Sequence, residues 1–173
     1  EAVEALNKLK NSTLDFTKCG NQIKLTTLFC RCTSDKWGED EPFLIIRSDK
    51  TGFQQLWHHG LNNDQSWQLN KAIDLNSRIS IELRDDDAPL ADDFLGTIEI
   101  TADRLKGVAE FRGCGSHYDI HWDQGPAMLE CQEAIRKVHL AALNQASEQV
   151  QRNVGIRAQL EQQREGAIQE LDS

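Results

Sequence analysis

The sequence predicts a mainly β protein, an antiparallel sandwich with a short helix before it and a long helix after it. Between residues 12 and 125, short segments of alternating apolar and polar residues recur, with turn-forming residues between them. From residue 126 onward, apolar residues instead recur at steps of three or four, which is typical of a helix. We therefore expect three parts, residues 1–11, 12–125 and 126–173.

The first part, residues 1–10, intersperses apolar residues with charged ones and predicts a short amphipathic helix. Leu14 and Phe16 then alternate with polar residues, and a turn signal follows at Cys19 and Gly20. A second alternating segment begins at Ile23. This pattern predicts a β-hairpin and hence two strands ahead of residue 35.

Five later segments are also predicted to be strands, because apolar residues in them alternate with polar ones or form short runs. They are residues 43–47, 53–57, 79–83, 97–100 and 118–122. The polar stretch 60–65 is predicted to be a loop. Short strands separated by turns favour two packed antiparallel sheets.

Residues 127–171 contain no aromatic residue and no proline, and they are rich in Ala, Gln, Glu and Arg. A long helix is expected there, with a narrow apolar stripe. A helix of roughly 65 Å is too long for one small sandwich to cover. We therefore expect a protein partner or self-association through this helix, with the contacts made by Ile135, Val138, Val150 and Val154.

Two acidic segments stand out, each next to a predicted strand. Carboxylates that gather in neighbouring loops repel one another unless a hard cation lies between them, and calcium takes six to eight oxygen ligands in flexible geometry. If the two segments meet in space, their carboxylates suit roughly two calcium ions. The candidate ligands are Asp35, Asp40, Glu41, Asp85, Asp87 and Asp93.

The spacing of these acids resembles that of the C2 domain, a calcium-dependent phospholipid-binding β-sandwich. Asp35 is followed six residues later by Glu41, and Asp85 and Asp87 are followed by Asp93 and then Gly96. The resemblance covers roughly residues 12–123. Glu41 stands where that family usually has Asp, and its longer side chain can still bind a metal.

The resemblance implies a C2-like fold, bound Ca²⁺, and calcium-dependent association with a phospholipid membrane surface. The tips of the acidic segments carry apolar residues, Trp37 in the first and Pro89 and Leu90 in the second, which are expected to contact the membrane. The lysine-rich strand that some family members use for phosphoinositides is absent, so no such specificity is expected.

An alternative hypothesis is that the protein is a non-enzymatic structural or adaptor subunit. In it the sandwich is a scaffold, and the long C-terminal helix docks into a multi-chain assembly. No sequence motif of a hydrolase, phosphate-binding loop or zinc protease is present, so no enzyme is expected. The net charge of −9, without a basic stripe, argues against nucleic acid.

A zinc site near Cys114 is a further hypothesis, because His117, Asp119 and His121 share one face of a predicted strand. The plainer interpretation is a half-buried strand with its polar side in water.

Five cysteines leave at least one thiol without a partner in the chain, and a Cys19–Cys114 bridge is possible but is not fixed by the sequence. The compartment stays open, with a peripheral membrane or secreted location slightly favoured. The glycosylation acceptor sequence at Asn11 is informative only for a secreted protein.

Overall fold

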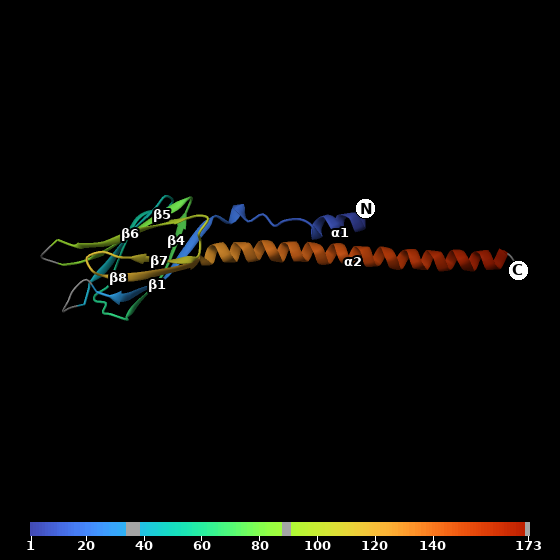
Figure 1. The fold of residues 1–173 in the computed structure, drawn as a ribbon. Helices are drawn as coiled ribbons and strands as arrows, with labels where there is room; N and C mark the ends of the chain where they lie inside the picture. The colour runs from blue at the N-terminus through green and yellow to red at the C-terminus, as the bar shows by residue number, and fades with distance from the viewer. Residues whose placement is uncertain (34–38, 88–90, 172–173) are drawn as a thin grey trace. The chain divides into compact units, whose positions relative to one another are not determined.

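The computed structural model describes residues 1–33, 39–87 and 91–171, and the chain divides into two compact units. One unit runs from Thr17 to Cys131 and holds all the strands (Figure 1). The other combines residues 1–16 with the chain from Gln132 onward and is helical. Each unit is described by itself below.

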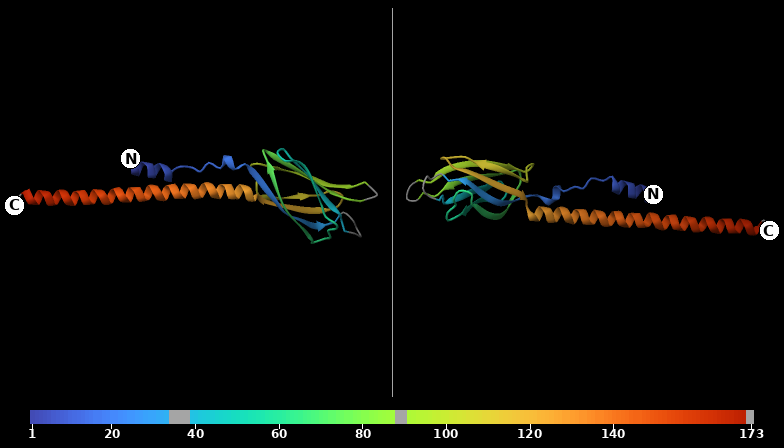
Figure 2. Two further views of the ribbon diagram at one scale, coloured as in Figure 1. Left: turned by 180° about the vertical axis from the view of Figure 1, so that it is seen from behind. Right: turned by 60° about the horizontal axis from the view of Figure 1, so that its bottom comes forward.

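Among the residues that the structure describes, eight strands form two four-stranded antiparallel sheets. This arrangement confirms the mainly β sandwich (Figures 1 and 2). One sheet has the order β4-β1-β8-β7 and the other the order β3-β2-β5-β6. The strands are β1 (Asn21–Cys32), β2 (Pro42–Ser48), β3 (Gly52–Trp57), β4 (Ser66–Leu75), β5 (Arg78–Asp85), β6 (Asp93–Thr101), β7 (Gly107–Phe111) and β8 (His117–Gln124).

The core lies between the two sheets and is filled by alternate residues of the strands. In β5, the alternating Ile79, Ile81 and Leu83 are all fully buried. In β8, Tyr118, Ile120 and Trp122 face the same interior. Burying each such side chain contributes about 1.5–3 kcal/mol, so the alternation in the sequence fixes which face of each strand points inward.

The predicted hairpin is wrong, because residues 12–16 form no strand and only β1 precedes residue 33. Residues 17–19 instead form a 3₁₀ turn, η1 (Thr17–Cys19). The reason is that β1 already pairs with β4 on one side and β8 on the other. A strand containing Leu14 and Phe16 therefore has no edge of β1 to join, and the Arg136 guanidinium lies over the Phe16 ring instead, 5.1 Å from its centroid.

Two strands were not predicted from the sequence. β4 does alternate, with Trp67 and Leu69 half-buried and Ile73 and Leu75 buried, so its signal was present. β7 is only five residues long, and Phe111 is its one fully buried side chain. Such a short segment gives too few alternations to distinguish a strand from a loop.

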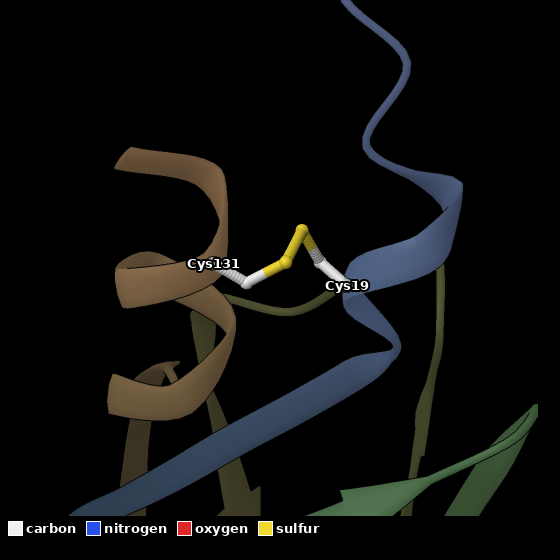
Figure 3. The surroundings of a disulfide bond; sticks show 2 residues. All are labelled: Cys19 and Cys131. Atoms are coloured by element: carbon white, nitrogen blue, oxygen red, sulfur yellow. A yellow bond between two sulfur atoms is a disulfide. The ribbon is translucent and has the colours of Figure 1, made fainter. Parts of the chain in front are cut away.

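A disulfide joins Cys19 in η1 to Cys131 in the first turns of α2 (Pro126–Leu171), with their Cα atoms 5.5 Å apart (Figure 3). The Cys19–Cys114 bridge considered from the sequence is therefore not formed, and Cys114 is an exposed free thiol. Gln22 supports the same junction, because its side-chain carbonyl accepts a hydrogen bond of 2.9 Å from the Ala127 amide. That amide is one of the donors that a helix start leaves unpaired.

The helical unit contains α1 (Ala2–Lys10) and most of α2, and both helices agree with the sequence prediction. Along α2, Ile135 and Val150 are half-buried, whereas Val138 and Val154 are 72% and 61% exposed. No helix in the described part of the chain has an apolar stretch long enough to cross a membrane.

Candidate metal centre

Described acidic residues from both segments lie at one end of the sheet β3-β2-β5-β6. Asp85 is the last residue of β5 and pairs with Pro42, the first residue of β2, on one side. On the other side Asp85 pairs with Asp93, the first residue of β6. Since neighbouring strands lie about 4.8 Å apart, these strand ends bring Glu41, Asp85 and Asp93 to one edge.

Hydrogen bonds hold the two segments together at their base. The Glu41 amide donates to the Asp85 Oδ1 atom at 2.6 Å, and the Asp86 amide donates to the Glu41 carbonyl at 3.2 Å. Asp85 is only 1% exposed, so its carboxylate is part of the structure that positions the others. Asp87 and Asp93 are half-buried, and Glu41 is exposed.

The structure explains why residue 96, at the end of the second acidic segment, is a glycine. Gly96 pairs with Leu83 beside an irregularity in the β5–β6 register, and its φ of +142° is a conformation that other residues rarely adopt. A Cβ atom there would lie 3.3 Å from the Phe111 ring of the opposite sheet. The short spacing from Asp93 to Gly96 therefore positions the start of β6 against the core.

Three aspartates lie close enough to the Cys114 thiol for their charges to act on it. Partial loss of water around the sulfur raises the pKa of the exposed Cys114 thiol, and the negative charges of Asp93, Asp87 and Asp85 raise it further. The Cys114 Sγ atom also lies 3.6 Å from the Phe94 carbonyl oxygen, to which it donates. The loop between β7 and β8 therefore reaches the same acidic end as the ends of β5 and β6.

Asp40, also expected as a ligand, has a different environment. Its side chain is fully buried, and its Oδ2 atom accepts a hydrogen bond of 2.5 Å from the Tyr118 hydroxyl of the facing sheet. This hydrogen bond gives the Asp40 carboxylate a partner within the protein, and its expected role as a ligand stays a prediction. The sequence did not show which of the adjacent acids Asp40 and Glu41 has its side chain pointing inward. That direction depends on the register of the neighbouring strands.

Four other expected residues, Asp35, Trp37, Pro89 and Leu90, lie outside the described residues, so their roles stay predictions. Within the described ranges, Glu41, Asp85, Asp87 and Asp93 do not bring three ligand atoms within 4.8 Å of one another. Calcium ligands at right angles lie about 3.3–3.7 Å apart. No three of these four carboxylates are therefore close enough, as they lie, to hold one ion, although their oxygen atoms are donors of the type that a hard cation takes.

A tighter group lies elsewhere, on the outer face of the other sheet. Ligand atoms of Glu110, His117 and Asp119 all lie within 4.8 Å of one another. The expectation that this face of β8 lies in water is wrong for Asp119, which is 4% exposed and forms an ion pair of 2.5 Å with Arg31. His121 is exposed, as expected. Glu110 was missed because β7 was missed, and Arg31 because it is distant in sequence.

Comparison with known proteins gives no match to a protein-family model and no match to a curated protein. Solved structures do resemble the chain. A C2 domain has a TM-score of 0.47 at 15% identity, covering 61% of this chain and 98% of that one. The C2A domain of plant extended synaptotagmin 1 has a TM-score of 0.39 at 9% identity, covering 60% and 93%.

Calcium-bound extended synaptotagmin 2, with its C2A and C2B domains, has a TM-score of 0.39 at 19% identity, and the match covers 59% of this chain and 45% of that one. These are likenesses of fold at low identity. The chain itself folds as a β-sandwich of two antiparallel four-stranded sheets, accompanied by a helical unit.

Proposed function

We propose that the sandwich is a non-enzymatic, calcium-binding module that associates with a phospholipid surface when calcium is bound. The observation that carries this proposal is the meeting of Glu41, Asp85, Asp87 and Asp93 at one end of the sandwich. Their carboxylates come from two segments more than 40 residues apart in sequence, and they reach the same edge through strand pairing.

The chemistry of these residues suits calcium. Glu41, Asp87 and Asp93 would hold the ion, and Asp85 supports them through its bond to the Glu41 amide. Calcium bound there supplies positive charge and open coordination positions that lipid phosphate oxygens can fill. Without it, four carboxylates on a chain of net charge −9 repel an anionic membrane.

Trp37, Pro89 and Leu90 would then contact the lipid, because they lie in the sequence between the acids. Each large apolar side chain that leaves water for the membrane interface contributes on the order of 1–3 kcal/mol. Calcium therefore acts as the switch, and the apolar tips add affinity.

Sedimentation with vesicles of phosphatidylcholine and phosphatidylserine tests this function. The chain should pellet with vesicles in calcium and stay in the supernatant with chelator, and Trp37→Ala should weaken the pelleting. Asp87→Asn with Asp93→Asn should abolish it, whereas Asp92→Asn, an exposed acid beside Asp93, serves as the matched control. Pelleting that persists with chelator would contradict the switch.

A second function, docking of the helical unit into a multi-chain assembly, is favoured by a different observation. Apolar side chains are exposed along the part of α2 that belongs to the helical unit, and they include Val138, Leu140, Val154, Ile156, Leu160 and Ile168. In this function the sandwich is a scaffold. The two functions are compatible, because they use different units of the chain.

A further inference from the structure

We propose that Glu110, His117 and Asp119 form a binding site for a divalent transition ion of the Zn²⁺ type. The site lies on the outer face of the sheet β4-β1-β8-β7 and is separate from the acidic residues proposed to bind calcium. It uses a nitrogen ligand, which calcium does not prefer.

The register of β7 and β8 places the three side chains together. Glu110 pairs directly with Asp119, and His117 lies two residues before Asp119 on the same strand. Since Tyr118 and Ile120 point into the core, His117 and Asp119 point to the opposite face. Side chains of paired residues in an antiparallel sheet have Cβ atoms about 4.5–5.5 Å apart, which is close enough for both to reach one ion.

The distances between the ligand atoms agree with tetrahedral zinc coordination. The His117 Nε2 atom lies 3.4 Å from the Asp119 Oδ1 atom and 3.6 Å from the Glu110 Oε2 atom. Zinc bonds to nitrogen and carboxylate oxygen are about 2.0–2.2 Å long, so two ligands of a tetrahedral ion lie about 3.3–3.6 Å apart. The side chains therefore need little movement to bind an ion.

Two of these atoms are buried without a hydrogen-bond partner. They are the His117 Nε2 atom and the Asp119 Oδ1 atom, and Asp119 as a whole is 4% exposed. Buried polar atoms in proteins are nearly always hydrogen-bonded or bound to an ion or water. Both atoms point at the same space, so one ion would satisfy them together.

Arginines hold the two carboxylates from outside. Arg31 donates from Nε, at 2.6 Å, to the Asp119 Oδ2 atom, which leaves the Oδ1 atom facing His117. Arg112 donates to the Glu110 Oε2 atom at 2.8 Å. Partners that orient ligands in this way are typical of metal sites. The Glu110 and His117 side chains are 51% and 20% exposed, so water can reach a fourth coordination position.

Isothermal titration of the full chain with ZnCl₂, in saturating calcium, tests the site independently of the proposed calcium function. We expect one Zn²⁺ per chain, and His117→Gln and Glu110→Gln should each lower the affinity at least about tenfold. His121→Gln is the matched control, because His121 is exposed four residues further along β8 and should be dispensable.

A second readout uses Co²⁺ in place of Zn²⁺, because tetrahedral Co²⁺ gives visible absorption bands that report its ligands directly. These bands should appear with the wild-type chain and with His121→Gln, and be absent with His117→Gln. Equal zinc affinity in the wild type and both ligand variants would overturn the proposal. The absence of zinc binding to the wild type would also overturn it.

Discussion

The Tyr118 hydroxyl of β8 donates a hydrogen bond to the buried carboxylate of Asp40, which lies two residues before β2 of the other sheet. Burial raises the pKa of Tyr118, so the hydroxyl keeps its proton and stays a donor to Asp40. Tyr118→Phe removes that donor and should lower the free energy of unfolding by about 1–3 kcal/mol.

Urea denaturation at neutral pH measures this effect. Thr97→Val is a suitable control, because it removes an exposed hydroxyl from β6. A Tyr118→Phe chain as stable as the control would show that the Asp40 carboxylate gains nothing from the contact.

Asp49 holds the turn between β4 and β5 through several hydrogen bonds. The Ser77 hydroxyl donates to its Oδ2 atom at 2.5 Å, and the Ser77 and Asn76 amides donate to its carboxylate at 2.6 and 2.7 Å. The Ser77 hydroxyl is the main cause that lowers the pKa of Asp49 to about 2. The ordinary pKa of about 3.9 in the unfolded chain is higher, so ionised Asp49 stabilises the fold.

This stabilisation should be complete above about pH 4 and lost as the pH falls through about 2. Asp49→Asn should therefore lower the urea midpoint at pH 7, and the gap to the wild type should close near pH 2. A gap that stays constant from pH 7 to pH 2 would show that ionisation of Asp49 is not its source. Asp92→Asn controls for the loss of one negative charge.

At this scale, part of the candidate site follows from the sequence. Glu41 precedes a short apolar run, and Asp85 and Asp93 adjoin alternating segments, so their placement at strand ends was predictable. The inward direction of the Asp40 side chain and the pairing of Glu110 with Asp119 could not be predicted from the sequence. Both depend on register between strands that are far apart in the sequence, which local patterns do not contain.

At the scale of secondary-structure elements, the disulfide bond links η1 covalently to α2. Cys19 and Cys131 are 112 residues apart, so the bond closes a long loop around the whole sandwich. Replacing both with serine should lower the free energy of unfolding by about 2–5 kcal/mol, chiefly because the unfolded chain is then less constrained. Such bonds persist in oxidising compartments.

Urea denaturation of Cys19→Ser with Cys131→Ser checks this expectation, with Cys114→Ser as the control for loss of a free thiol. The double variant should unfold at clearly lower urea, whereas the control should match the wild type. Equal midpoints for the double variant and the wild type would contradict a stabilising bond.

Strong alternation identified most elements, and its failures have physical causes. β5 and β8 were predicted because their inward positions are uniformly large and apolar. Residues 12–16 alternate as well, yet both edges of β1 are taken, so no partner remains. Alternation indicates a possible strand, and the availability of a neighbouring edge decides whether it forms.

For the whole molecule, the exposed apolar residues of α2 predict that the chain binds a partner or itself. If it associates with itself, light scattering should give a mass above 19.6 kDa. Val138→Glu with Val154→Glu should then restore the monomer, since both side chains are largely exposed and the fold does not need them apolar. Lys137→Gln with Arg157→Gln is the matched control, because it makes the net charge more negative by the same two units. A monomeric wild type would count against self-association.

The central claim for the molecule is that the acidic end of the sandwich binds calcium. Calorimetric titration of the full chain with CaCl₂ tests it most directly, on the wild type and on Asp87→Asn with Asp93→Asn. This pair spares Asp85, whose carboxylate bonds the Glu41 amide. The account predicts calcium binding by the wild type and an affinity at least about tenfold lower in the variant. Equal affinity in both chains, or no binding by the wild type, would contradict it.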